Sequence, residues 1–161
     1  MSDNVLCLDS NIVIWGFLPN GKTETEQKMK KKVSAFLQKC FNEKIKFAVS
    51  IISLSEFFVQ IPENEKTHFL EIFQKNFIIL DFNLAAAMQA ASIFHEQYGK
   101  MKRSYYESRG ILRQDIQILA TILAFGKLKL ITEDYGFQKL AANYDIPVSG
   151  IPEFLEQGYL L

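Results

Sequence analysis

Short apolar runs alternate with amphipathic stretches along the whole chain. Apolar or alternating runs bounded by polar residues predict strands, and such runs lie at 5–8, 46–50, 76–80, 127–132 and, as a short edge strand, 146–148. Apolar residues spaced three and four apart predict helices between them, at 11–17, 25–42, 53–61, 66–75, 84–98, 112–125 and 135–143. Strands separated by helices predict an α/β fold, a parallel sheet with helices on both faces.

Composition narrows the class of protein without naming a function. The chain has 161 residues, for which one domain spanning 1–161 is the expectation, and 48% of them are apolar, enough for a sizeable core. Eighteen basic and 18 acidic residues cancel, so only a local patch could bind nucleic acid. Two cysteines without metal-ligand spacing predict a reduced, cytoplasmic setting. Neither a signal peptide nor a run of about 20 apolar residues is visible, so we expect no membrane association.

Four carboxylates fall at one predicted edge of the sheet. Asp9 follows the first strand, Glu56 lies in the first turn of the helix after the second, and Asp134 comes two residues after the fourth. Asp115 opens the helix before the fourth strand, and a crossover helix running antiparallel to the strands begins at that same edge. Crowded carboxylates need protons or cations, and all-oxygen ligands favour Mg²⁺ or Mn²⁺. Such a site suits phosphodiester hydrolysis. Asp81, after the third strand, is expected farther out, as a turn or cap residue.

Each of these acids also has a purely structural interpretation. Asp9 and Asp134 are placed to cap the helices that follow them. Glu56 fits the return half of a capping box with Ser53. Asp115 in a first helical turn would complement the helix dipole. Four separate caps need not converge at one edge, however, and their predicted convergence favours the metal site.

Three segments together resemble the motif regions of PIN-domain ribonucleases, the group that includes VapC-type toxins. They read LCLDSNIVIWGF, SIISLSEFF and LRQDIQILATILAFGKLKLITEDYGF, in the family's order and over nearly the whole chain. The resemblance implies a three-layer α/β/α sandwich with a central parallel sheet of four to five strands, and RNA cleavage with Mg²⁺ or Mn²⁺. By position it implies catalytic acids Asp9, Glu56, Asp115 and Asp134, metal ligands Asp9, Asp115 and Asp134, and supporting residues Ser10, Asn11 and Thr132.

A basic and aromatic stretch just before Asp115 is a candidate RNA-binding segment. Cations suit phosphates and rings suit base stacking in single-stranded RNA, although a solvated loop is an equal alternative. The residues are Lys100, Lys102, Arg103, Arg109 and Arg113, with Tyr98, Tyr105 and Tyr106 among them. Glycines 99 and 110 bracket the stretch as if it were a mobile flap. A second group, Lys28 and Lys30–Lys32, reads as a solvated helix face.

The leading hypothesis is a metal-dependent endoribonuclease and, more narrowly, the toxin of a type II toxin–antitoxin pair. Its expected partners are an RNA substrate, an antitoxin protein and a second copy of the chain. One alternative is a non-catalytic PIN-like module that binds RNA or a protein. Another is a different metal-dependent phosphoryl hydrolase, although a dehalogenase-type phosphatase would need an aspartate where Asn11 stands, and no glycine-rich phosphate loop occurs.

Overall fold

The computed structural model describes residues 5–18, 22–100 and 109–151. Within these ranges one parallel sheet contains five strands in the order β3-β2-β1-β4-β5. Their bounds are β1 (Val5–Leu8), β2 (Lys46–Ser50), β3 (Phe77–Leu80), β4 (Lys129–Ile131) and β5 (Val148–Ser149). The predicted α/β class, parallel direction and strand number are therefore confirmed.

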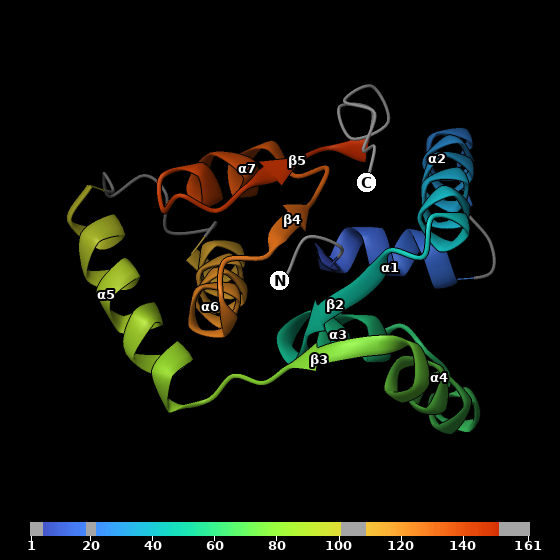
Figure 1. Ribbon diagram of the computed structural model, residues 1–161, viewed down its shortest axis with the longest axis horizontal. Coiled ribbons are helices and arrows are strands. Elements are labelled where there is room, and N and C mark those ends of the chain that lie inside the picture. Colours follow the sequence, from blue (N-terminus) through green and yellow to red (C-terminus); the bar gives the residue numbers. More distant parts are fainter. Residues whose placement is uncertain (1–4, 19–21, 101–108, 152–161) are drawn as a thin grey trace.

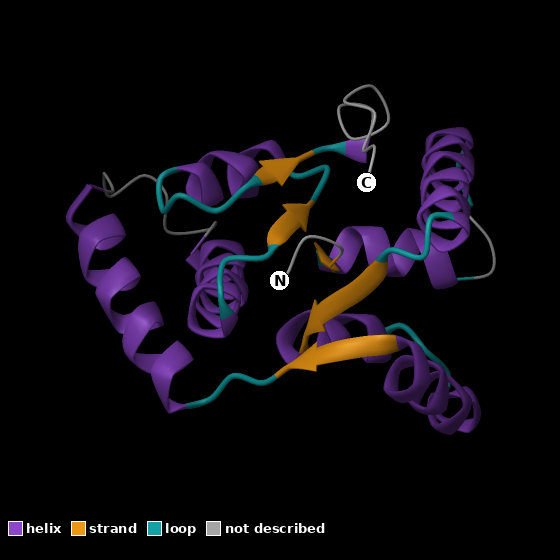
Figure 2. Ribbon diagram, in the orientation of Figure 1, coloured by secondary structure: helices purple, strands orange, loops and turns teal. Residues whose placement is uncertain are grey.

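Helices cover both faces of this sheet, which gives the three predicted layers (Figures 1 and 2). One face carries α1 (Ser10–Phe17), α2 (Glu24–Asn42), α3 (Ile51–Val59) and α4 (Glu63–Asn76). The other carries α5 (Leu84–Lys100), α6 (Arg109–Phe125) and α7 (Tyr135–Ala142). In the described ranges, none of these helices combines the length and the apolar character needed to cross a membrane.

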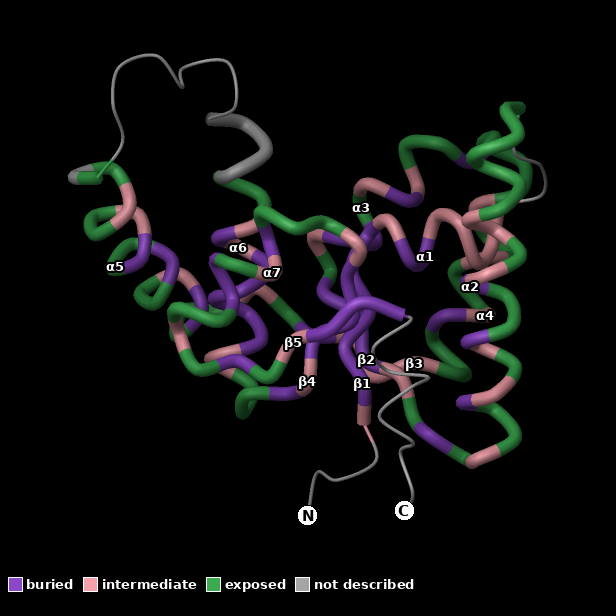
Figure 3. Tube along the Cα trace, turned by 90° about the horizontal axis from the view of Figure 1, so that it is seen from above, coloured by how far each residue is buried: buried purple, intermediate pink, exposed green. Residues whose placement is uncertain are grey.

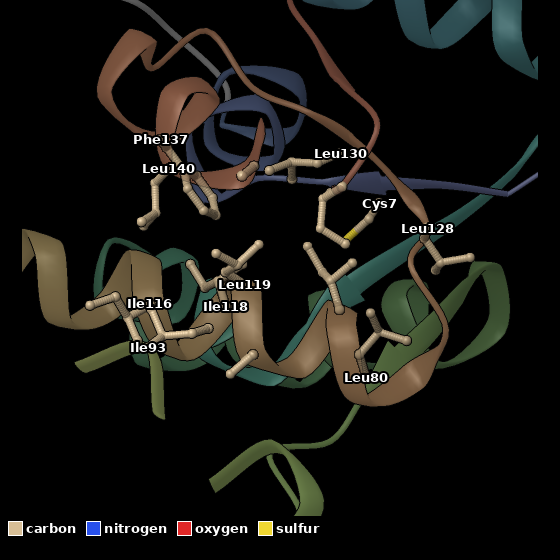
Figure 4. Packing of buried hydrophobic residues seen from close by; sticks show 14 of the residues in the cluster. Cys7, Leu80, Ile93, Ile116, Ile118, Leu119, Leu128, Leu130, Phe137 and Leu140 are labelled. Atoms are coloured by element: carbon tan, nitrogen blue, oxygen red, sulfur yellow. The ribbon is translucent and has the colours of Figure 1, made fainter. Parts of the chain in front are cut away.

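The two-residue period of the strands divides the core into two halves. In β1, Leu6 and Leu8 pack toward the face covered by α1–α4, whereas Cys7 packs toward the face covered by α5–α7. Figure 4 shows side chains of α6 and α7 meeting Cys7 and Leu130 of the sheet. The strands consequently form the buried centre of the molecule, with exposed positions on the outer sides of the helices (Figure 3).

A cluster of phenylalanines closes the half of the core beneath α1–α4. Phe73 of α4 is fully buried, with its ring centroid 5.3 Å from that of Phe17, 5.2 Å from Phe57 and 5.0 Å from Phe77. Tilted and edge-on ring contacts at such distances add to the stabilisation from buried area. These rings connect α1, α3, α4 and β3. They therefore hold in place the two helices next to the candidate acids, since Asp9 caps α1 and Glu56 lies in α3.

Three helices begin two or three residues before their predicted starts, namely α3, α4 and α6, and two of these corrections concern candidate acids. The capping box of Ser53 and Glu56 does not form, because α3 begins at Ile51 and the Ser50 hydroxyl accepts hydrogen bonds from the Ile52 and Ser53 amides. Helix α6 begins at Arg109 rather than at 112, so its first turn holds no acidic residue. Of the flap expected between glycines 99 and 110, α5 includes the residues up to Lys100 and α6 those from Arg109, and residues 101–108 lie outside the described part of the chain.

Candidate functional site

The register of the sheet brings three chain segments to the same level. Leu8 lies opposite Val49 of β2 and Ile131 of β4, so the residues that follow, Asp9, Ser50 and Thr132, lie at the same level of the sheet, at the carboxyl ends of their strands. The Asp9 amide continues the ladder by donating to the Ile131 carbonyl at 3.1 Å. This edge, at the carboxyl ends of the strands, is where ligands bind in open α/β sheets.

Asp9 is a buried carboxylate that is held at both oxygens. Its side chain caps α1, with Oδ1 accepting from the Ser10 amide at 2.7 Å, and Oδ2 accepts from the Thr132 hydroxyl at 2.6 Å. The residue is 5% exposed, and burial raises the pKa of Asp9 to about 6. The two hydrogen bonds oppose this rise, whereas the charges of Glu56 and Asp134 add to it. Asp9 is thus rigidly placed but electrostatically strained.

Thr132 connects Asp9 to Asp134. Its hydroxyl donates to Asp9 and accepts from the Asp134 amide at 3.1 Å. Asp134 caps α7, with Oδ1 accepting from the Phe137 amide at 2.9 Å, and its side chain is exposed. The capping interpretation therefore holds for both Asp9 and Asp134, and capping itself sets the direction in which each carboxylate points.

Asp115 and Glu56 have no capping role that would explain their position. Asp115 is the seventh residue of α6 and is half-buried. Burial raises the pKa of Asp115 to about 7, with further contributions from Asp9, Asp134 and Glu56. Glu56 is half-buried in α3 and raises the pKa of both Asp9 and Asp115. The structure hence brings all four acids within electrostatic range, whereas Asp81 is exposed beyond the edge strand β3.

Two of the three expected supporting residues, Ser10 and Asn11, and also Ser53, have unused hydrogen-bonding atoms. Ser10 is 8% exposed, and among the described residues its hydroxyl has no partner. The same is true of the Asn11 side-chain oxygen and of the fully buried Ser53 hydroxyl on α3. Buried polar groups usually have partners, so these atoms leave hydrogen-bonding capacity at the start of α1 and in α3.

Most of the predicted RNA-binding residues cannot be placed. Lys102 and Arg103 lie outside the described residues, and so does the side chain of Arg109. Lys100 is exposed at the end of α5, and Arg113 is exposed on α6, two residues before Asp115. The structure leaves the RNA-binding role of the whole group a prediction.

The sequence marks Glu133, between Thr132 and Asp134, only as a less favoured substitute for Asp134, and does not predict its contacts. Its Oε2 forms an ion pair with Nζ of Lys32 on α2 at 2.8 Å, and its Oε1 accepts from the Ile151 amide at 2.7 Å. Lys32 belongs to the group read as a solvated helix face, which is wrong for this residue. No local pattern could have found the pair, because its members are 101 positions apart.

An apolar cavity of about 840 Å³ opens at the opposite edge of the sheet, away from the acids. Residues at the starts of β2 and β3 line it, together with Phe17 of α1 and Leu37 and Phe41 of α2. Its apolar lining carries none of the four carboxylates, which separates this cavity from the acidic edge.

Neither a protein-family model nor a curated protein sequence matches the chain. Solved structures do resemble it. A chain of VapBC2 from Rickettsia felis, crystallised with a DNA fragment from the promoter of the pair, is 16% identical with a TM-score of 0.60, over 91% of this chain and 98% of that one. A chain of a toxin–antitoxin complex from Klebsiella pneumoniae is 21% identical with a TM-score of 0.53, over 80% and 86%.

The chain has a PIN-like fold. At these identities the likeness concerns the fold, and the chemistry has to be judged from the residues of this chain. The PIN-like sheet presents carboxylate and hydroxyl oxygens at its carboxyl edge, a donor set that suits a hard divalent cation.

The charge balance at this edge of the PIN-like fold also fits a cation. Within the described part of the chain, the four acids form no ion pair with lysine or arginine. The ligand spacing, however, is not formed: in the residues described, no three Asp, Glu, His or Cys side chains gather closely enough to hold a metal ion. The donor chemistry thus fits Mg²⁺ or Mn²⁺, while the side chains stand apart.

Proposed function

We propose that the chain is a metal-dependent endoribonuclease, which hydrolyses RNA phosphodiester bonds with Mg²⁺ or Mn²⁺ held by Asp9, Asp115 and Asp134. The observation that carries the proposal is the raised pKa of two neighbouring buried or half-buried acids, Asp9 and Asp115. Burial and neighbouring carboxylates raise the pKa of Asp9 to about 6 and that of Asp115 to about 7. Carboxylates in such surroundings are stabilised by a cation, and perturbed groups of this kind concentrate at functional sites.

The candidate acids differ in how firmly their side chains are held, and we assign their roles in metal binding accordingly. Asp9 is fixed by Ser10 and Thr132 and presents its remaining lone pairs to a ligand. Asp115 and Glu56 are half-buried, and a bound cation would offset the repulsion between carboxylates and allow them to approach Asp9. When bound, the metal would supply an activated water and would stabilise the negative charge that develops on the phosphate.

The biological setting proposed for this activity is a toxin–antitoxin pair. Support comes from the two similar structures, one of VapBC2 and one described as a toxin–antitoxin complex. An antitoxin protein and a second copy of the chain are accordingly the proposed protein partners, and RNA is the proposed substrate. A cytoplasmic location is part of the same proposal, and the two buried free cysteines, Cys7 and Cys40, are compatible with it.

The decisive test is cleavage of a generic single-stranded RNA by the purified chain, with Mn²⁺ or with EDTA. We expect cleavage with Mn²⁺ only, and its loss in Asp9→Asn, which keeps the size of the side chain and removes the charge. Asp81→Asn is the matched control, an exposed aspartate after a strand of the same sheet, and it should cleave as the wild type does. Equal rates for Asp9→Asn and the wild type would contradict the proposal.

The unformed ligand spacing favours a second candidate, a non-catalytic module that binds RNA or a protein partner. Such a module would bind RNA in a gel-shift assay and leave it intact with Mn²⁺. Its RNA affinity would also be the same in Asp9→Asn and in the wild type, because Asp9 would then serve only to cap α1. Cleavage and binding measured on the same two proteins therefore separate the two candidates.

A further inference from the structure

Glu133 joins three segments that are distant in sequence. It lies in the turn between β4 and α7, it pairs with Lys32 of α2 at 2.8 Å, and it accepts the Ile151 amide just beyond β5 at 2.7 Å. Both carboxylate oxygens are therefore occupied, and the side chain is only 16% exposed. Side chains engaged at both oxygens and largely shielded from water are more firmly held than surface ion pairs.

The turn that Glu133 anchors carries two residues of the proposed metal site. Thr132, immediately before it, donates to Asp9, and Asp134, immediately after it, caps α7. The first half of the turn has further anchors, since the Thr132 amide donates to the Ser149 carbonyl and the Gln138 side chain donates to the Thr132 carbonyl. Asp134 is exposed, and its hydrogen bonds in the described part of the chain are local: its side chain accepts from the Phe137 amide, its amide donates to the Thr132 hydroxyl and its carbonyl accepts from the Gln138 amide. Glu133 is thus a tertiary anchor directly beside Asp134.

We propose that Lys32 and Glu133 are positioning residues for the metal site: their ion pair holds the turn in which Thr132 and Asp134 face Asp9. This inference rests on the proposed function. Without Lys32, Glu133 would be a largely buried carboxylate lacking its counter-charge, a costly arrangement that a turn relieves by moving toward water. Such a movement would carry Asp134 away from Asp9 and weaken metal binding, although neither Lys32 nor Glu133 touches the metal.

Removing Lys32 distinguishes a positioning role from a purely electrostatic effect, because the two predict opposite changes in the affinity for Mn²⁺. A lysine near an acidic site repels a divalent cation, so Coulomb's law alone predicts that Lys32→Met binds Mn²⁺ more tightly. Loss of positioning predicts weaker binding. Lys28→Met is the matched control: Lys28 lies one turn earlier on α2, carries the same charge and, among the described residues, pairs with the exposed Glu24 alone.

The experiment is calorimetric titration of the full chain with Mn²⁺ at pH 8, with thermal unfolding to verify that each variant is folded. We expect Lys32→Met to bind Mn²⁺ about tenfold more weakly, as is usual when a group that orients a ligand is lost. Lys32→Arg should restore the affinity, and Lys28→Met should leave it unchanged. In an Asp134→Asn background Lys32→Met should have no further effect, because the positioning acts through Asp134.

Wild-type or tighter Mn²⁺ binding by Lys32→Met would overturn the positioning role while leaving the proposed function intact. A further loss in the Asp134→Asn background would overturn it as well. Absence of Mn²⁺ binding by the wild type would instead refute the proposed function and the inference with it. Lys32→Ala removes the same charge with a smaller side chain and carries the same prediction should the Met variant not fold.

Discussion

Ionised Asp9 should destabilise the metal-free protein, and Asp9→Asn should relieve that cost. The pKa of Asp9 rises from an ordinary value of 3.8 to about 6 in the folded state. The folded state therefore holds the proton more tightly than the unfolded chain, so the contribution of Asp9 to stability is complete below pH 4 and is lost as the pH rises through 6. Asparagine resembles the protonated acid in size and charge and escapes this loss.

The two pKa values set the magnitude of the effect. Linkage gives an advantage for Asp9→Asn of roughly 1.5 kcal/mol at pH 5 that grows to about 3 kcal/mol at pH 8. The residue is almost fully buried, so solvent screening reduces this only modestly. Because hydrogen bonds to a charged oxygen are stronger than those to an amide, the measured gain should fall somewhat below these values.

Urea unfolding of both proteins in EDTA, followed by circular dichroism at several pH values between 5 and 8, measures this difference directly. Asp81→Asn, at an exposed aspartate, is the control and should show no pH-dependent gain. An Asp9→Asn protein that is no more stable than the wild type at pH 8, or whose gain shrinks as the pH rises, would refute the assignment of a strained carboxylate at this position.

Three further predictions concern the same framework. Thr132→Val removes the hydroxyl that donates to Asp9, so we expect a loss of about 1–3 kcal/mol in urea unfolding at pH 8, with Thr132→Ser retaining most of the stability; an unchanged midpoint for Val would contradict the contact. Mn²⁺ should raise the melting temperature at pH 8 and hardly at all at pH 5. At pH 5 protons compete with the metal for Asp9 and Asp115, because their pKa values are raised to about 6 and about 7. A shift of the melting temperature that does not depend on pH would argue against these two ligands. Phe73→Ala should cost about 3–5 kcal/mol, since the ring is fully buried among other phenylalanines, and a loss below 1 kcal/mol in urea unfolding would show that the cluster is not the core of its layer.

The strands, their parallel direction and the common edge of the acids were predictable from apolar periodicity, because a parallel sheet buried on both faces requires nearly continuous apolar runs. Helix starts were less predictable. The largely apolar stretch from 47 to 59 holds most of β2 and all of α3, and the pairing of Ser50 with Leu80 of β3 shows where the strand ends. The glycine at 110 indicated a boundary, yet a single glycine costs a helix only about 1 kcal/mol, and α6 includes it.

Contacts between distant segments lay beyond the reach of sequence reasoning. The pairing of Lys32 with Glu133 depends on α2 and the β4–α7 turn meeting in space, and no periodicity records that meeting. The same applies to the Thr132 hydroxyl: its support of Asp9 came only from the family resemblance, and its second bond to the Asp134 amide required the structure. Local patterns thus predict which residues reach the edge, and the tertiary structure determines how they are held.

The central place of β1 has a consequence for synthesis on the ribosome. β1 is the first strand to be made, yet one of its two neighbours is β4, at residues 129–131. Until β4 has left the exit tunnel, one side of β1 has no strand to pair with, and contacts of such long sequence separation form late in folding. Thr132 and Asp134 follow β4 directly, so a nascent chain cannot assemble its acidic edge until most of the protein has been translated.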